Sequence, residues 1–351
     1  MASRNTLRRA LLYIPGSSQR FIDKSRTLTA DCVAYDLEDS VTPHKKVEAR
    51  SLVRRALDQP APQGIRERAV RINSVDSGLA LGDLTEVSPI LVIHRLPPLP
   101  LPIHKPHTNP ELPYAAQIPQ PHNHRPPKSQ LPLRPNLHQR RNHSHPLIPI
   151  RLCLPHPRPP ISILALIESA KSLTNLTQIC SATPLLQGLI FAAEDFALDL
   201  SITRTPSLTE FLFARSMITT AARAANLPST IDLVCTAYKS TSGDGAPPPA
   251  LEEECRDGRR LGFNGKQCIH PSQVPTAQAI FGPDKEEVQW AVRVCIADEK
   301  AARAGRGAWT LDGKMIDVPV AEKARAVVRK AEVCGFDVQG LREQWRHQEP
   351  E

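Results

Sequence analysis

The sequence has no apolar run as long as the roughly 18 residues that a membrane-spanning helix needs, so no membrane partner is expected. It also has no Cys-x-x-Cys pair, and none of its histidines stands at the spacing of a zinc site. We therefore interpret its eight scattered cysteines as reduced thiols in the core of an intracellular protein, mitochondrial or cytoplasmic. The sequence favours neither compartment.

Residues 88–160 contain no glycine and almost no acidic residues. Nine lysines and arginines stand there against a single acid, Glu111, which accounts for the whole formal net charge of +8. The rest of the chain is therefore neutral. A neutral body argues against a nucleic-acid partner, because nucleic-acid-binding proteins carry basic surfaces.

The same segment is rich in proline and histidine. It holds 20 of the 35 prolines and nine of the 12 histidines, and no helical or alternating period survives in it. Proline at this density removes sheet hydrogen-bond donors and is incompatible with helix interiors. Our interpretation is that the segment is not a native reading of its gene, as a retained intron or a shifted frame would give. A disordered insertion and a basic interaction arm for proline-binding grooves or polyanions stay open as alternatives.

Outside this segment, strand patterns alternate with helix patterns. The expected strands cover residues 10–14, 32–37, 69–73, 161–167, 186–193, 230–234 and 266–269. Several are continuous apolar runs, which suit strands buried on both faces of a parallel sheet. The alternation predicts an α/β fold in which parallel strands form a barrel. No strand is expected between residues 88 and 160, which leaves the barrel one strand short, with two exposed edges.

These patterns divide the chain into four parts. They are the first part of the barrel with three strands (7–87), the irregular or disordered segment (88–160), the second part of the barrel (161–282) and a C-terminal helical extension (283–340). A chain of 351 residues is long enough for one large barrel with such additions.

Two carboxylates each close a buried-strand pattern. Glu168 follows the run 161–167, and Asp195 follows the run 186–193. They stand about one strand–helix repeat apart, so we expect their strand ends to be neighbours at the face where α/β barrels build active sites. Two hard oxygen ligands side by side suggest Mg²⁺ or Mn²⁺. Alternatively, each carboxylate caps the helix that follows it.

Three further charged residues end strands in the first part of the chain. Arg71 belongs to a buried-strand pattern and is always charged, so it needs an anionic partner. Glu38 or Asp39, which end the second strand, could be this anionic partner in a structural ion pair. The turn at Pro15 and Gly16 precedes a helix start, where backbone N–H groups offer an anion site.

Seven short motifs resemble, in order, those of the HpcH/HpaI aldolase/citrate lyase family, in its citrate lyase β-subunit-like branch. They are Leu11–Gly16 (LLYIPG), Asp36–Asp39 (DLED), Val70–Asn73 (VRIN), Leu166–Ser169 (LIES), Ala193–Asp195 (AED), Gly262–Pro271 (GFNGKQCIHP) and Asp312–Pro319 (DGKMIDVP). The resemblance covers residues 7–87 and 161–337. It implies a TIM-type (β/α)₈ barrel with a C-terminal helical extension.

The resemblance also implies roles for individual residues. Glu168 and Asp195 match the family's Mg²⁺ ligands. Arg71 matches an arginine that binds substrate and faces the oxygen of an enolate, while Glu38 and Asp39 match an outer shell of the metal site. Apart from the resemblance, the phosphates of coenzyme A would suit the anion site at Pro15 and Gly16, as would no ligand.

Asp317 matches an aspartate of the acyl-CoA-active relatives. In malyl-CoA and citramalyl-CoA lyases this residue reaches the site of a neighbouring subunit and acts as a general base. Its presence implies a homo-oligomer, trimeric if it follows the family. The function implied is a Mg²⁺-dependent carbon–carbon lyase acting on a short 3-hydroxyacyl-CoA such as citramalyl-CoA or malyl-CoA. Malyl-CoA thioesterase or malate synthase activity at the same site, or an inactive lyase-like protein from a defective gene reading, remain alternatives.

Overall fold

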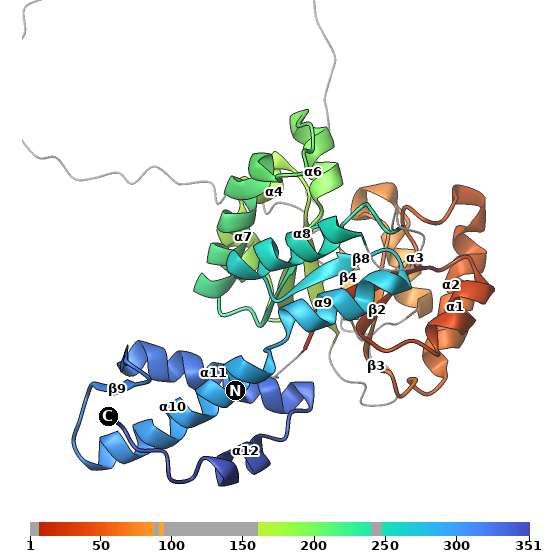
Figure 1. Cartoon of the computed structure of the whole chain (residues 1–351). Coiled ribbons are helices and arrows are strands. Elements are labelled where there is room, and N and C mark those ends of the chain that lie inside the picture. The colour runs from red at the N-terminus through yellow and green to blue at the C-terminus, as the bar shows by residue number, and fades with distance from the viewer. Residues whose placement is uncertain (1–6, 88–90, 95–160, 240–247) are drawn as a thin grey trace, which may run out of the picture. The chain divides into compact units, whose positions relative to one another are not determined.

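The structure is a computed structural model, and it describes residues 7–87, 91–94, 161–239 and 248–351 (Figure 1). Most of the Pro/His-rich segment lies outside the described residues. The interpretations of that segment as a defective reading, an insertion or an interaction arm therefore stay predictions.

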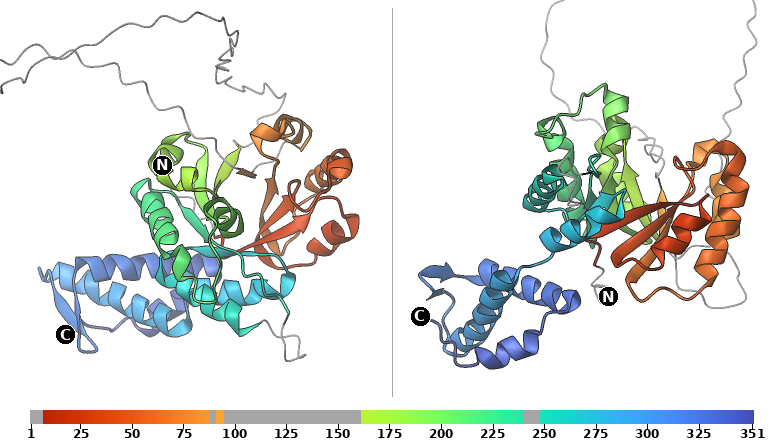
Figure 2. Two further views of the ribbon diagram at one scale, coloured as in Figure 1. Left: turned by 90° about the horizontal axis from the view of Figure 1, so that it is seen from above. Right: turned by 45° about the vertical axis from the view of Figure 1, so that its right-hand side comes forward.

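Eight parallel strands form a closed barrel in chain order (Figures 1 and 2). The strands are β1 (Ala10–Pro15), β2 (Ala30–Asp36), β3 (Ile65–Arg71), β4 (Leu91–His94), β5 (Ser162–Ile167), β6 (Leu186–Phe191), β7 (Ser229–Asp232) and β8 (Gly265–Cys268). β8 pairs with β1 and closes the barrel. The TIM-type barrel is thus confirmed.

The expectation that one strand is missing was wrong. β4 lies inside the segment 88–160 and pairs in parallel with β3 and with β5. It is the short apolar run Leu91–His94, and its Ile93 is fully buried. The sequence analysis missed this strand because the proline-rich composition that follows it made the whole segment 88–160 read as irregular. The barrel therefore has no open edge at this position.

Helices follow the strands and cover the barrel (Figure 2). They are α1 (Gln19–Ser25), α2 (Lys46–Asp58), α3 (Ala80–Val87), α4 (Ala170–Thr174), α5 (Leu176–Ser181), α6 (Ala193–Leu200), α7 (Leu212–Ala224), α8 (Pro249–Arg260) and α9 (Val274–Phe281). The main apolar core lies between strands and helices and includes Leu12 of β1 and Ile218 of α7.

A second, smaller apolar cluster fills the inside of the barrel. On β1 it contains Leu11 with Tyr13 packed against it, and on β5 it contains Leu164 and Leu166. These positions alternate along each strand, as expected when successive side chains point to opposite faces. By the same alternation Glu168, two positions beyond Leu166, continues the inward-facing series.

The C-terminal extension has its own apolar core. It consists of α10 (Lys285–Arg303), β9 (Trp309–Leu311), β10 (Lys314–Ile316), α11 (Val318–Cys334) and α12 (Val338–Gln344). The segment around Trp309 is an antiparallel hairpin in which Trp309 and Ile316 pair and are both buried. Among the helices that the structure describes, none combines the length and apolar character required to cross a membrane.

Candidate active site

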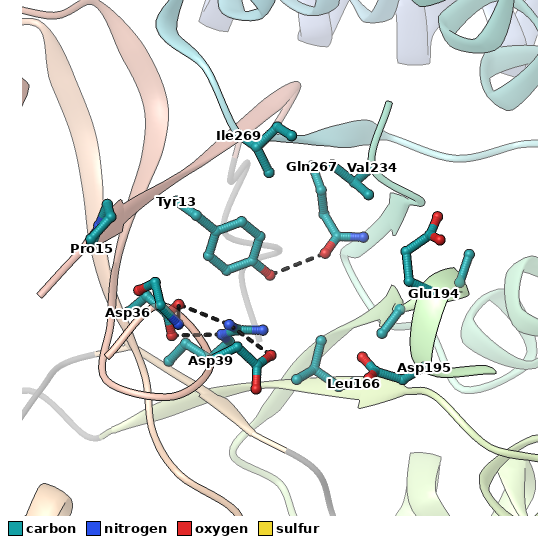
Figure 3. Close-up of a pocket in the computed structure, with 14 residues that line it drawn as sticks. Tyr13, Pro15, Asp36, Asp39, Leu166, Glu194, Asp195, Val234, Gln267 and Ile269 are labelled. Atoms are coloured by element: carbon teal, nitrogen blue, oxygen red, sulfur yellow. Dashed lines mark hydrogen bonds and ion pairs between the residues drawn. The ribbon is translucent and has the colours of Figure 1, made fainter. Parts of the chain in front are cut away.

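A pocket of about 510 Å³ lies at the carboxyl ends of the barrel strands (Figure 3). Pro15 ends β1, Asp36 ends β2 and Arg71 ends β3, and all three line it. Asp195, in the first turn of α6, lines the opposite wall. In α/β barrels this face carries the catalytic groups, because the strand-to-helix loops converge there.

Arg71 is held by carboxylates of the β2 end. Its Nε and Nη2 donate to Oδ1 and Oδ2 of Asp36 at 2.7 and 2.8 Å. Nη2 also lies 3.0 Å from Asp39, and Nε lies 3.6 Å from Glu38. The sequence predicted Glu38 or Asp39 as the partner, and both are in contact, but the bidentate partner is Asp36, which sequence reasoning missed.

Parallel pairing explains why Asp36 takes this role. Asp36 and Arg71 are register partners on β2 and β3, so their side chains lie side by side. Burial by itself would lower the pKa of Arg71. Its hydrogen bonds to Asp36 outweigh this effect, so the pKa of Arg71 lies above its usual value. Burial likewise opposes ionisation of Asp36, yet Arg71 holds the pKa of that carboxyl below its usual value. The pair is therefore fully ionised.

The carboxyl of Glu38 has a raised pKa. Its burial, together with the negative charges of Asp39, Glu168 and Asp36, raises its pKa to about 7, against the opposing effect of Arg71. Carboxylates that raise one another's pKa in this way lie close together. The mouth of the barrel therefore holds more negative charge than its arginine balances, which is the setting that a cation stabilises.

Glu168 follows β5 and is 6% exposed. The alternative that it caps the next helix does not hold, because the side chain of Ser169 caps α4 in a capping box with Ser172. The backbone N–H of Glu168 donates to the Ser172 hydroxyl at 3.1 Å. By the alternation along β5 its side chain belongs to the inward-facing series, and its negative charge raises the pKa of Glu38.

Asp195 stands on the neighbouring strand end. The N–H of Ala192 donates to the Ile167 carbonyl at 3.0 Å, so the ends of β5 and β6 that lead to Glu168 and Asp195 are adjacent. Asp195 lies in the first turn of α6, whose N-cap Ala192 supplies no side-chain acceptor. The helix dipole therefore favours its negative charge, and it lines the pocket as well.

These carboxylates fit a hard divalent cation that keeps most of its water. Among the described residues, no group of three or more histidines, cysteines and acids is arranged as a ready-made metal site. Mg²⁺ typically binds one or two carboxylates and retains several waters for exchange with substrate oxygens. Glu168 and Asp195 stand at adjacent strand ends, in a pocket mouth where carboxylates outnumber the arginine, and they match that requirement.

The turn after β1 differs from the expected anion site. The Gly16 N–H donates to the Asp36 carbonyl at 2.9 Å, so this amide is already used within the barrel. A Cβ at Gly16 would lie 2.6 Å from the same carbonyl oxygen, which explains the glycine. Pro15 does line the pocket. Gly16 therefore provides close packing of β1 on β2, and Pro15 provides pocket wall.

Asp317 is not among the residues that line this pocket. It is the N-cap of α11 in the C-terminal extension, and its Oδ1 accepts a hydrogen bond from Val320 N at 3.1 Å. Within one chain, the structure does not bring Asp317 together with the other predicted site residues.

The pocket also contains polar residues that the sequence did not single out. Tyr13 and Gln267 are hydrogen-bonded at its base (Figure 3). Glu194 is held by Arg204, which also donates to Glu254 at 3.0 Å. The only signal for Tyr13 was its place in the inward-facing series of β1.

Comparison with known proteins agrees with the resemblance that the sequence motifs carry. The family model described as HpcH/HpaI aldolase/citrate lyase matches residues 9–99 and 140–271. Human mitochondrial citramalyl-CoA lyase is 30% identical over 332 residues, covering 92% of this chain and 85% of that protein. The citrate lyase β subunit of Escherichia coli K12 is 30% identical over 329 residues, covering 94% of this chain and 95% of that protein.

A solved structure shares the fold. It is the protein CitE of Mycobacterium tuberculosis in complex with magnesium, acetoacetate and coenzyme A. The two superpose with a TM-score of 0.61 at 24% identity, covering 93% of this chain and 99% of that one.

Proposed function

The chain belongs to the HpcH/HpaI aldolase/citrate lyase family, and we propose that it is a Mg²⁺-dependent carbon–carbon lyase. Its proposed substrate is a short 3-hydroxyacyl-CoA such as citramalyl-CoA or malyl-CoA, which it cleaves or forms by retro-aldol/Claisen chemistry. The observation that carries the proposal is the cluster of carboxylates beside one fixed arginine, in which the pKa of Glu38 rises to about 7.

Glu168 and Asp195 would hold the metal. They stand on adjacent strand ends, and both are hard oxygen donors. Bound Mg²⁺ would supply a Lewis acid for the carboxylate and adjacent oxygen of the acid half of the substrate. Glu38 and Asp39 would accept hydrogen bonds from metal-bound water and keep Arg71 in place.

Arg71 would stabilise the thioester enolate that forms when the carbon–carbon bond breaks. Its contacts with Asp36 and Asp39 use Nε and Nη2, which leaves Nη1, among the described residues, for a substrate oxygen. Because these carboxylates fix the guanidinium in advance, little reorganisation is needed as negative charge develops.

Asp317 would move the proton at the acetyl carbon from a neighbouring subunit. Its place outside the pocket of its own chain is consistent with such a role, since the extension would then complete the site of another copy. A homotrimer and binding of the coenzyme A moiety near Pro15 belong to the same proposal.

The test of this function is product analysis with the full-length protein. With Mg²⁺, citramalyl-CoA is expected to yield pyruvate and acetyl-CoA, malyl-CoA to yield glyoxylate and acetyl-CoA, and a chelator to stop both reactions. Release of free coenzyme A with the intact hydroxy acid would instead show a thioesterase. Failure to consume either thioester would contradict the lyase proposal and favour the defective gene reading.

The raised pKa of Glu38 predicts a pH-dependent stability of the metal-free protein. A carboxyl whose folded pKa lies above its ordinary value of 4.5 contributes stability that is complete below that pH and is lost as the pH rises through about 7. We therefore expect the thermal midpoint of wild type to fall between pH 5 and pH 8, and that of Glu38→Gln to fall less. The difference in the pH slope of the unfolding free energy should correspond to at most about one proton.

Differential scanning fluorimetry across this pH range measures the effect. Added Mg²⁺ should also flatten the slope, because a neighbouring cation favours ionised Glu38. Glu343→Gln is the matched control, since Glu343 is exposed on α12 and pairs with Arg346. Equal slopes for wild type, Glu38→Gln and Glu343→Gln would contradict the prediction.

A further inference from the structure

Two hydrogen-bonded side chains form the base of the pocket and have no role in the chemistry above. Tyr13 of β1 packs against the apolar cluster inside the barrel, and Gln267 stands on the adjacent strand β8. Both line the pocket, and Tyr13 Oη lies 3.1 Å from Gln267 Oε1 (Figure 3). The Arg71 guanidinium lies 5.2 Å from the centre of the Tyr13 ring, so the ring is fixed on that side too.

The amide of Gln267 has one orientation. Its Nε2 donates to the Phe191 carbonyl at 2.8 Å and to the Asp232 carbonyl at 3.0 Å, the ends of β6 and β7. Both amide hydrogens are therefore used, and Gln267 is 6% exposed. Its Oε1 is a carbonyl oxygen and can only accept.

The orientation of Gln267 determines the role of Tyr13. Since Oε1 only accepts, Tyr13 must donate its hydroxyl hydrogen to it. Burial also raises the pKa of Tyr13, so this hydrogen is retained at physiological pH. Toward the pocket, Tyr13 Oη therefore presents only lone pairs.

We propose that Tyr13, oriented by Gln267, is a specificity-determining residue that accepts a hydrogen bond from a ligand hydroxyl and thereby favours a 2-hydroxy acid group over the corresponding 2-keto acid. This inference rests on the proposed function, in which the acid half of the substrate carries such a hydroxyl. A hydroxyl can donate to Tyr13, whereas a keto oxygen offers only lone pairs. In the proposed cleavage Asp317 would take the hydroxyl proton as the carbon–carbon bond breaks to a keto group and a thioester enolate, and would return it to the acetyl carbon. The hydrogen bond to Tyr13 is thereby lost, and release of the keto acid is favoured.

Lactate and pyruvate test this inference without turnover, because they differ only in the hydroxyl and the keto group. Their dissociation constants would be measured by ligand-observed NMR titration with Mg²⁺ present, for wild type, Tyr13→Phe and Gln267→Met. Tyr13→Phe keeps the ring and removes the acceptor, so the preference for lactate should fall about fivefold. Gln267→Met frees the Tyr13 hydrogen to turn toward the pocket, so the preference should fall further, in favour of pyruvate.

The outcomes separate this inference from the proposed function. If both acids bind wild type but Tyr13→Phe leaves their ratio within twofold, or weakens both equally, Tyr13 is structural and the inference fails alone. If wild type with Mg²⁺ binds neither acid, the inference fails, while cleavage of the two thioesters decides the proposed function separately. Should Gln267→Met not fold, Tyr13→Phe still decides.

Discussion

Replacing Glu168 with glutamine is expected to lower Mg²⁺-dependent acyl-CoA cleavage by more than a hundredfold. Loss of an outer partner of a metal site typically costs about 10- to 100-fold, and loss of a direct carboxylate ligand should exceed that. Glutamine keeps the size and one oxygen of Glu168 but removes the negative charge. Since Glu168 is buried against β5 and does not cap α4, the fold should be retained.

The same substitution should make the metal-free protein more stable. Glu168 raises the pKa of Glu38, which means that the two carboxylates repel each other when no cation is present. Glu168→Gln removes this repulsion, so the thermal midpoint without Mg²⁺ should rise while activation by Mg²⁺ is lost. An increase in stability with a loss of function is typical of residues placed for catalysis.

Steady-state rates, Mg²⁺ titration calorimetry and thermal midpoints measure these effects. Glu322→Gln is the control, because Glu322 is exposed on α11 and pairs with Arg325. Undiminished activity of Glu168→Gln, equal with and without chelator, would remove Glu168 from the metal site. Lost activity with a lower midpoint would instead indicate a structural carboxylate.

The sequence predicted seven of the eight strands, several of them because buried parallel strands are continuous apolar runs. The strand that was missed is β4, the four residues Leu91–His94. It stands directly before a proline-rich stretch, which made the whole segment look irregular. Pairing with β3 and β5 defines it. Such tertiary pairing is not encoded in any local period.

The sequence also indicated that charged residues stand at the strand ends, because Arg71, Glu168 and Asp195 lie in or directly after strand patterns. Their pairing was not. Asp36 and Arg71 meet because β2 and β3 are in a register that places them side by side. Gly16 was expected to offer its amide to an anion, but the same close approach of β1 and β2 uses that amide on Asp36.

Replacing Arg71 separates a catalytic role from the structural ion pair that the sequence left open. Arg71→Met should abolish measurable cleavage and also destabilise the protein by about 3–5 kcal/mol, because it leaves the buried Asp36 carboxylate without its partner. Arg71→Lys keeps the charge but not the bidentate geometry. It should reduce kcat by about 10²- to 10³-fold with little change in KM, as expected for a donor that acts on charge developing in the transition state.

The decisive variant combines Arg71→Met with Asp36→Asn. Removing both charges should restore much of the stability lost in Arg71→Met, because the buried side chain at position 36 then carries no unpaired charge. The double variant should not restore cleavage, since the enolate still lacks the positive charge of Arg71. Denaturant unfolding gives the stability of each variant, and initial rates with saturating Mg²⁺ give the activity. If activity returned together with stability, Arg71 would be a structural partner of Asp36, and another group would have to stabilise the enolate.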